Sequence, residues 1–311
     1  MTRNLSLTLA AGLLSALLYL SVEKGLSLAL LSYLSPLPLM MAGLALGGGA
    51  VIAGGLVGAV AVAMVAGYAA ASFLVVAALP ALLVASRALL WRTLPDGSTE
   101  WYPPGLVLGW LTAAGLLLLL IIGVGLSFGN PDGFEAWVAH VIDRMLEAVA
   151  PEAPIEQRQQ AVRFWQRISP GTILGSWVAV AAINAVGAQR LLVRLGQNRR
   201  PSPVYRELWL PDWLGLVLVV TAAVAMLVGG DVGYVAGGLA IVTLVPFAFL
   251  GLAVIHGWVA GRPNARVVLA VTYGLLILAS GLAVVAVAGL GLVRFWTMRF
   301  RRGDSGGGME G

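Results

Sequence analysis

The 311-residue sequence contains no cysteine, two histidines and few charged residues, which make up 11% of the chain. Without cysteine there is no disulfide framework, no thiolate metal site and no cysteine nucleophile. Lys24 is the single lysine, and its sequence context excludes a phosphate-binding Walker loop. An average soluble domain has about 25% charged residues. Hydrophobic residues reach 59% here, so a soluble globular protein and a disordered one are both excluded.

Apolar runs of about 18 or more residues recur along the chain, and each is long enough to cross a bilayer as a helix. We therefore expect an all-α fold, a polytopic transmembrane helical bundle of eight to nine spans with an outer amphipathic helix pair. Pro36 and Pro38 forbid an unbroken helix at that point. The expected crossings are residues 5–22, 37–48, 50–70, 72–90, 105–128, 171–193, 213–229, 233–256 and 267–293.

Nine crossings would separate the C-terminal arginines from the arginines of the other basic loops, against the positive-inside bias. Two alternatives restore the bias. Either one glycine-rich or proline-broken segment is re-entrant, or the last apolar stretch does not fully cross. Residues 190–212, with five arginines against two acids, should form a cytoplasmic loop.

Residues 130–170 look water-soluble and carry two apolar stripes at helical spacing, which predicts a pair of amphipathic helices. Asp132 and Glu135 resemble a capping pair at the start of the first helix. Because the segment has six acids and four arginines, we expect it outside the cytoplasm. Its predicted interfacial residues are Trp137, Val141, Met145 and Trp165.

Polar groups within or between the spans are the candidate ligand-binding residues. Asn184 lies in the middle of one span, and Asp231 lies between two spans among glycines. Interhelical hydrogen bonding is the alternative for Asn184, and a solvated turn is the alternative for Asp231. His140 and His256 have no metal-ligand spacing, so we expect them at interfaces. We expect no catalytic residues, no metal site, no cofactor and no nucleic-acid partner.

Small residues four apart recur on the first span, where backbones could approach closely. The residues concerned are Gly12 and Ala16.

The order of these features resembles the YybS-like family, an uncharacterised family of bacterial membrane proteins. The segments that carry the resemblance are residues 35–39 (SPLPL), the amphipathic outer segment, residues 205–211 (YRELWLP), residues 251–256 (GLAVIH) and the aromatic and arginine-rich residues 290–302. That family is similar in its N-terminal half to the S-components of energy-coupling-factor transporters, compact bundles of about six helices. The resemblance implies that small residues on the first helix, here Ala11, Gly12, Ser15 and Ala16, contact a helix of an ATPase-linked transmembrane partner. This chain departs from S-components in its outer helix pair and its further C-terminal spans.

The resemblance implies the bacterial inner (cytoplasmic) membrane, and the charge pattern implies a cytoplasmic N-terminus. The expected organisation is an S-component-like bundle (1–128), an extracytoplasmic amphipathic segment (129–170), C-terminal spans (171–302) and a disordered tail (303–311).

Two functions follow. The first is a small-molecule-binding transport subunit, and the alternative is a non-transport scaffold or envelope-assembly factor that acts through its outer segment. An intramembrane enzyme has almost no candidate residues.

Overall fold

The computed structural model describes residues 2–306, without the side chains of residues 24, 26, 27, 280 and 300–306. The chain is 82% helical, and two short strands form a hairpin. Eight helical segments of the described residues are long and apolar enough to cross a membrane, and two apolar helices are shorter. The all-α polytopic bundle predicted from the sequence is thereby confirmed.

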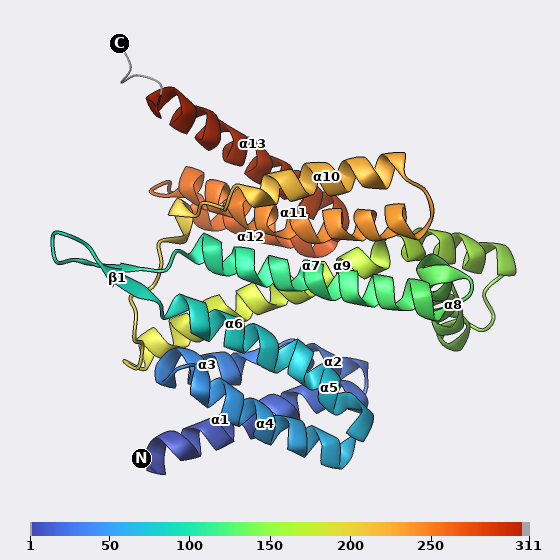
Figure 1. Ribbon diagram of the computed structural model, residues 1–311, viewed down its shortest axis with the longest axis horizontal. Helices are drawn as coiled ribbons and strands as arrows, with labels where there is room; N and C mark the ends of the chain where they lie inside the picture. Colours follow the sequence, from blue (N-terminus) through green and yellow to red (C-terminus); the bar gives the residue numbers. More distant parts are fainter. Residues whose placement is uncertain (1, 307–311) are drawn as a thin grey trace. The chain divides into compact units, whose positions relative to one another are not determined.

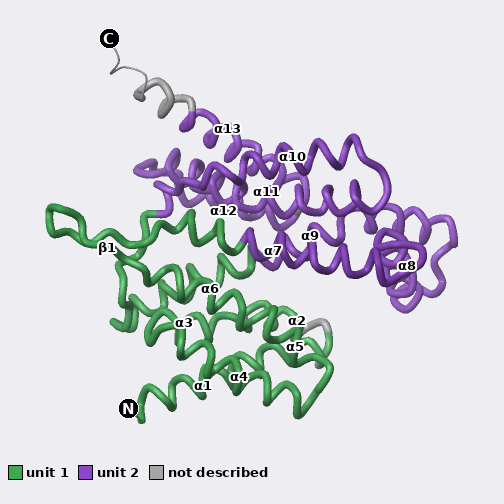
Figure 2. The backbone as a smooth tube through the Cα atoms, viewed as in Figure 1, with its two compact units in different colours: residues 1–111, 179–204 green, residues 112–178, 205–311 purple. Residues whose placement is uncertain are grey.

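The chain divides into two compact units. Unit 1 comprises residues 1–111 and 179–204, and unit 2 comprises residues 112–178 and 205–311 (Figure 2). Helices α7 and α9 each contribute to both units, so these units do not follow the division expected at residues 128 and 170.

In unit 1, the first helix is followed by a second candidate span, residues 28–46, which is interrupted by a turn. Pro36 and Pro38 lie at the start of α3, where a missing backbone N–H costs no helical hydrogen bond. The helix interruption predicted at these prolines is present, since α2 ends at Ser32 and α3 begins at Pro36. The elements of unit 1 before α7 are α1 (Thr2–Leu20), η1 (Ser21–Lys24), α2 (Leu26–Ser32), α3 (Pro36–Leu46), α4 (Gly48–Val65), η2 (Gly67–Ala69), α5 (Ala70–Phe73), η3 (Leu74–Ala78), α6 (Leu79–Ala88), β1 (Trp91–Thr93) and β2 (Thr99–Trp101).

Helices α1 and α4 approach each other closely at glycines. A Cβ placed on Gly12 would lie 2.2 Å from the Gly54 carbonyl oxygen, and one on Gly58 would lie 2.8 Å from the Gly12 carbonyl oxygen. Ser15 and Ala16, on the same side of α1, are 0% and 2% exposed. The predicted close approach is therefore present, but its partner is α4 of the same chain. That these small residues also dock a helix of another subunit stays a prediction, and the same chain already covers Gly12, Ser15 and Ala16. Their neighbour Ala11 is only partly buried.

Unit 2 contains most of the long helices. Its elements are α7 (Pro104–Gly129), α8 (Gly133–Val149), α9 (Ile155–Arg194), η4 (Tyr205–Glu207), α10 (Trp213–Leu227), α11 (Gly230–Val259), α12 (Ala265–Leu278) and α13 (Ser280–Gly306), with α7 and α9 shared with unit 1 (Figure 1).

Helix α9 is continuous over 40 residues and contains Pro170. The sequence-based boundary between an outer helix and a span starting at residue 171 is therefore wrong. A proline removes the N–H that would bond to the carbonyl four residues earlier, here that of Gln166. The hydroxyl of Tyr234 on α11 donates to this Gln166 oxygen at 2.5 Å. The freed carbonyl thus gains a partner from a neighbouring helix, and the helix continues through the proline.

The last apolar stretch, predicted as one span over residues 267–293, is broken at Ala279. Helix α12 leads away from the end of α11, and α13 returns in the direction of α11 (Figure 1). Cβ atoms placed on Gly251 and Gly291 would each lie 1.9 Å from a carbonyl oxygen of the other helix, those of Val287 and Phe247. Helices α11 and α13 therefore pack backbone against backbone.

The α12–α13 hairpin has the dimensions of a re-entrant segment. Helix α12 has 14 residues, or about 21 Å, against a hydrocarbon core of about 30 Å. Residues at the tip are apolar and exposed, with Leu278 at 86% and Leu282 at 82%. Segment 281–299 of α13 is long enough to cross the membrane on its own. However, α12 is too short to reach the far side, so α13 would begin within the hydrocarbon core. The arrangement favours the alternative in which the last apolar stretch does not fully cross.

The expected C-terminal disordered tail, residues 303–311, overlaps this last helix. Helix α13 continues to Gly306, so the first four residues of that segment are helical. Residues 307–311 lie outside the described residues.

Cysteine labelling tests the hairpin directly, because the native sequence has no cysteine to remove. In membrane vesicles of both orientations, Gly281→Cys at the tip should resist a membrane-impermeant maleimide from either side. Arg262→Cys, in the turn before α12, should react from one side only. Labelling of Gly281→Cys from the side opposite to Arg262→Cys would mean that α12 crosses the membrane.

Candidate functional site

A polar cluster lies in unit 1 where the span formed by α2 and α3 is broken. It consists of Ser15 on α1, Tyr33 and Ser35 in the break, and Asn184 on α9. Asn184 is 4% exposed, and its Nδ2 donates to the carbonyl oxygens of Tyr33 and Val180, each at 2.8 Å. The interhelical hydrogen bond that was one expectation for Asn184 is therefore present.

Two oxygen atoms of this polar cluster have no hydrogen-bond partner. They are Oδ1 of Asn184 and Oγ of Ser35, and both are buried. The backbone carbonyl of Ser35 is occupied, since it accepts from the hydroxyl of Ser15 at 2.5 Å. An amide oxygen can only accept, so the Asn184 oxygen needs an N–H or O–H donor.

Burying such groups without partners costs about 1–3 kcal/mol each by mutational measurement. Most buried polar atoms in proteins have a partner, so exceptions point to strain, function or a bound molecule. The polar cluster is thus a place in unit 1 where two buried oxygens lack the partner that such atoms usually have. The ligand role predicted for Asn184 stays a prediction.

Arg200 forms hydrogen bonds with both segments that flank the β hairpin of unit 1. It is 6% exposed, and its Nη1 donates to the carbonyl oxygens of Ala88 and Tyr102, at 2.8 and 3.2 Å. Its own carbonyl oxygen accepts from Nε2 of the buried Gln189 at 2.9 Å. In the sequence, Arg200 looks like an ordinary charged loop residue, because its sequence neighbours do not distinguish it from Arg199.

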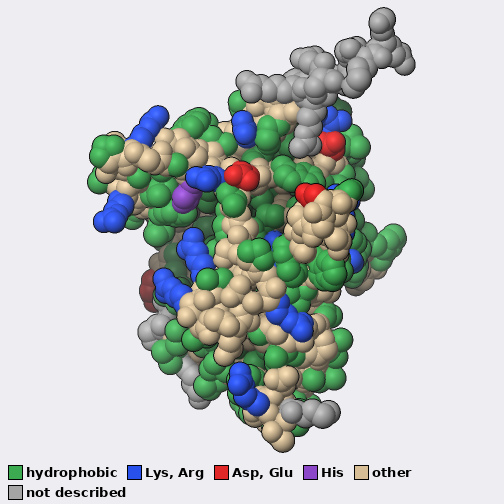
Figure 3. Space-filling view, turned by 90° about the vertical axis from the view of Figure 1, so that its left-hand side faces the viewer, with side chains coloured by type: hydrophobic (Ala, Val, Ile, Leu, Met, Phe, Trp, Pro, Cys, Tyr) green, Lys and Arg blue, Asp and Glu red, His purple; other side chains and the backbone are tan. Residues whose placement is uncertain are grey.

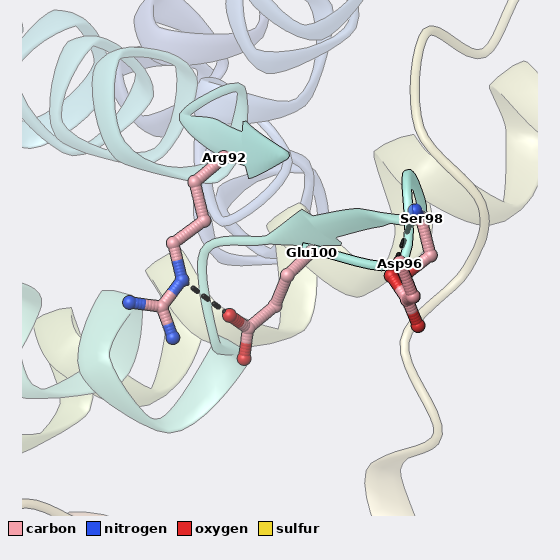
Figure 4. Close-up of polar contacts among 4 residues, drawn as sticks. All are labelled: Arg92, Asp96, Ser98 and Glu100. Carbon is pink, nitrogen blue, oxygen red and sulfur yellow. Dashed lines mark hydrogen bonds and ion pairs between the residues drawn. The ribbon is translucent and has the colours of Figure 1, made fainter. Parts of the chain in front are cut away.

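The hairpin of β1 and β2 pairs Trp91 with Trp101 and carries an ion pair between Arg92 and Glu100 (Figure 4). In its turn, the hydroxyl and the backbone N–H of Ser98 donate to Oδ1 of Asp96 at 2.6 and 2.9 Å. The Ser98 hydroxyl is the main reason that the pKa of Asp96 lies below its usual value, and the backbone N–H adds to it. These contacts hold a tight turn on an exposed hairpin, and they form no concave site.

Asp231 acts as a cap on another helix of unit 2. Its carboxylate accepts the backbone N–H groups of Phe134 and Glu135, at 2.7 and 3.1 Å, in the first turn of α8. Gly133 makes room for it, since a Cβ there would lie 2.7 Å from Oδ2 of Asp231 and its φ is +84°. The capping pair predicted within α8 is wrong: Asp132 occupies the N-cap position but makes no side-chain cap hydrogen bond.

The sequence could not show this cap, because Asp231 and α8 are about one hundred residues apart. Asp231 is half-buried, and its two oxygens already accept hydrogen bonds from α8. A ligand role for Asp231 stays a prediction, whereas these hydrogen bonds give it a structural role. Tyr234, one turn along α11, adds an edge-to-face ring contact with Phe134 at 5.3 Å.

The amphipathic outer segment leaves apolar side chains uncovered. On α8, Phe134 and Val138 are buried against the unit, whereas Trp137 and Met145 are 38% and 63% exposed. Val141 lies between these extremes, half-buried. Trp165, near the start of α9, is 49% exposed. The predicted interfacial residues thus lie largely outside the packed interior of unit 2, where lipid or another molecule can reach them.

The histidines join no group of ligands. His140 is exposed on α8. His256 packs its ring against Tyr273, and its Nδ1 lies 2.9 Å from the Leu252 carbonyl oxygen. Within the described residues, no group of three or more His, Cys, Asp or Glu side chains could hold a metal ion.

Replacing Asp231 tests the cap. Asp231→Ala leaves two N–H groups at the start of α8 without an acceptor and should destabilise the first turn by about 1–2 kcal/mol. Hydrogen–deuterium exchange should then speed up at the amides of Phe134 and Glu135. Asp132→Ala is the matched control and should leave these amides protected. Equal loss of protection in both variants would contradict the cap.

Comparison with known proteins places the chain in a family. A family model described as "Predicted membrane protein (DUF2232)" matches residues 12–293, most of the chain. No curated protein and no solved structure matches the sequence. The matched segment runs from α1 into α13 and includes the polar cluster and the Asp231 cap. The chain therefore belongs to the DUF2232 family of predicted membrane proteins.

Proposed function

We propose that this chain is a small-molecule-binding subunit of a membrane transport system and that its ligand binds at the polar cluster of unit 1. The observation that carries the proposal is the pair of unpartnered buried oxygens, Asn184 Oδ1 and Ser35 Oγ. Ligand sites in transporters commonly form where a spanning helix is interrupted near the middle of the bilayer. The α2–α3 break is such an interruption, and Asn184 faces it from α9.

The ligand class follows from the chemistry of the free atoms. The Asn184 oxygen accepts only, and the Ser35 hydroxyl can donate or accept. No charged side chain belongs to the polar cluster. The ligand is therefore a neutral polar molecule that presents an N–H or O–H group.

The energy source belongs to another subunit, since the sequence lacks a Walker loop. The resemblance to the YybS-like family and to S-components supports an ATPase-linked transmembrane partner. Gly12, Ser15 and Ala16 of α1 are buried within the chain. The exposed leucines of α1 remain for lipid or for such a partner: Leu5, Leu13 and Leu17 are 59%, 52% and 68% exposed.

The proposed location is the inner membrane of a bacterium, with the N-terminus in the cytoplasm. In this orientation the arginine-rich loop over residues 195–212 is inside and the acidic segment over residues 130–170 is outside. This agrees with the positive-inside bias. A re-entrant α12–α13 hairpin also keeps the C-terminal arginines inside.

Ser35→Ala gives the sharpest test of the ligand site. The Ser35 hydroxyl makes no hydrogen bond within the protein, so its loss removes a buried unpartnered group and no hydrogen bond, and the thermal stability of the ligand-free protein should stay the same or rise. Native mass spectrometry of protein purified gently from its own membrane should show a bound small molecule in the wild type. Occupancy should fall about tenfold or more in Ser35→Ala and in Asn184→Leu.

Thr221→Val is the matched control, because it removes a hydroxyl from the apolar helix α10 whose hydrogen bonds stay within that helix. It should keep full occupancy. A wild-type protein with no bound molecule and no co-purifying ATPase-linked partner would contradict the proposal. Equal occupancy in Ser35→Ala, Asn184→Leu and wild type would contradict the assigned site.

A non-transport scaffold is the second candidate, and the exposed apolar side chains of the outer segment favour it. Amphipathic helices bind membrane surfaces or partners through such faces. In the same purification, the double change Val141→Asp and Met145→Asp should remove an associated protein while α8 stays folded. Retention of every associated protein would count against the scaffold.

A further inference from the structure

The inference concerns Arg87, in the last turn of α6 in unit 1. Its guanidinium lies 4.1 Å from the centre of the Trp110 ring on α7. Its Nε is buried and has no hydrogen-bond acceptor. Among the described residues, no carboxylate forms a salt bridge with Arg87. The side chain is therefore a fixed cation with unused donors.

The neighbours of Arg87 supply more positive charge and polar groups. Arg200 donates to the carbonyl oxygen of Ala88, the residue after Arg87. Trp110 donates from Nε1 to the hydroxyl of Tyr102 at 3.0 Å, so the Tyr102 hydrogen is free to be donated further. The nearby acid Glu100 is paired with Arg92 on the hairpin. An anion at Arg87 would thus meet one guanidinium group and one hydroxyl donor, with the charge of Arg200 nearby.

The location corresponds to the level of the lipid headgroups. Arg87 lies one residue before the end of the candidate span Gly67–Ala88. Four aromatic residues follow close behind it in the sequence, as in the aromatic belts at membrane surfaces: Trp91, Trp101, Tyr102 and Trp110. Figure 3 shows a face of the molecule on which Lys and Arg side chains outnumber Asp and Glu side chains. Basic pockets at this level bind anionic lipid headgroups.

We propose that Arg87 binds the phosphate of an anionic phospholipid. The planar guanidinium offers two parallel N–H groups to the phosphate oxygens. Trp110 covers one face of the guanidinium and fixes its orientation. Tyr102 donates a hydrogen bond from its hydroxyl, and the acyl chains lie along the apolar surface of α6. This site is separate from the polar cluster around Asn184, so it stands without the proposed transport function.

Native mass spectrometry of delipidated protein tests the proposal. Phosphatidylglycerol is titrated in detergent and compared with phosphatidylcholine, which has the same phosphate but no net charge. The wild type should bind one phosphatidylglycerol molecule at least about tenfold more tightly than phosphatidylcholine. Arg87→Gln should lose this preference. Arg87→Lys keeps the charge without the planar fork, so it should bind with intermediate affinity.

Arg92→Gln is the matched control, because Arg92 is a nearby exposed arginine already paired with Glu100. It should retain the preference of the wild type. Inorganic phosphate identifies the source of the phosphate: it should not displace the lipid at equal concentration, and displacement would assign the site to a free anion instead. Equal binding of phosphatidylglycerol by the wild type and Arg87→Gln, or no preference in the wild type, would overturn the proposal.

Discussion

Close backbone contact at glycines is the interaction on which this fold depends. Apolar side chains gain little from leaving lipid for the protein interior, so helices in a membrane associate through packing and hydrogen bonds. In unit 1, Gly12 and Gly54 bring α1 and α4 together. In unit 2, Gly251 and Gly291 do the same for α11 and α13, and there a Cβ on either glycine would overlap a carbonyl oxygen of the facing helix. Each unit therefore has a fixed helix pair around which the other helices pack.

The second constraint is that every backbone polar group in hydrocarbon needs a partner. Side chains of neighbouring helices supply such partners in the outer segment as well as in a span. In the outer segment, Tyr234 satisfies the carbonyl of Gln166, which Pro170 leaves free, and Asp231 satisfies the first amides of α8. At the α2–α3 break, Asn184 and Ser15 bond to the exposed carbonyls but leave two oxygens unpartnered. Because these two buried oxygens remain unpartnered, we propose that the ligand binds at this break.

Much of the architecture follows from the sequence, because long apolar runs cross a lipid bilayer as helices. The spans of α7 and α11 are predicted to within three residues at each end. The continuity of α9 and the break at Ala279 are not predictable in this way. The carbonyl that Pro170 leaves free is bonded by Tyr234, which is distant in the sequence, and α13 packs against Gly251 of another helix.

The candidate site is only partly predictable for the same reason. Asn184 stands out as a polar residue within a span. By contrast, Ser35, Arg87 and Arg200 look like ordinary turn and loop residues until distant segments meet them. The small residues of α1 indicate a packing surface, but the sequence contains no signal that distinguishes a helix of the same chain from a helix of a partner.

The glycines of α13 allow the most direct measurement of the central claim. A Cβ on Gly291 would lie 1.9 Å from the Phe247 carbonyl oxygen, whereas a Cβ on Gly289 would meet no neighbouring side chain or helix within 4 Å. The free energy of unfolding in mixed micelles should fall by about 1–3 kcal/mol for Gly291→Ala. It should stay the same or rise by up to about 1 kcal/mol for Gly289→Ala. Equal stability of the two variants would show that the fold does not depend on close backbone contact.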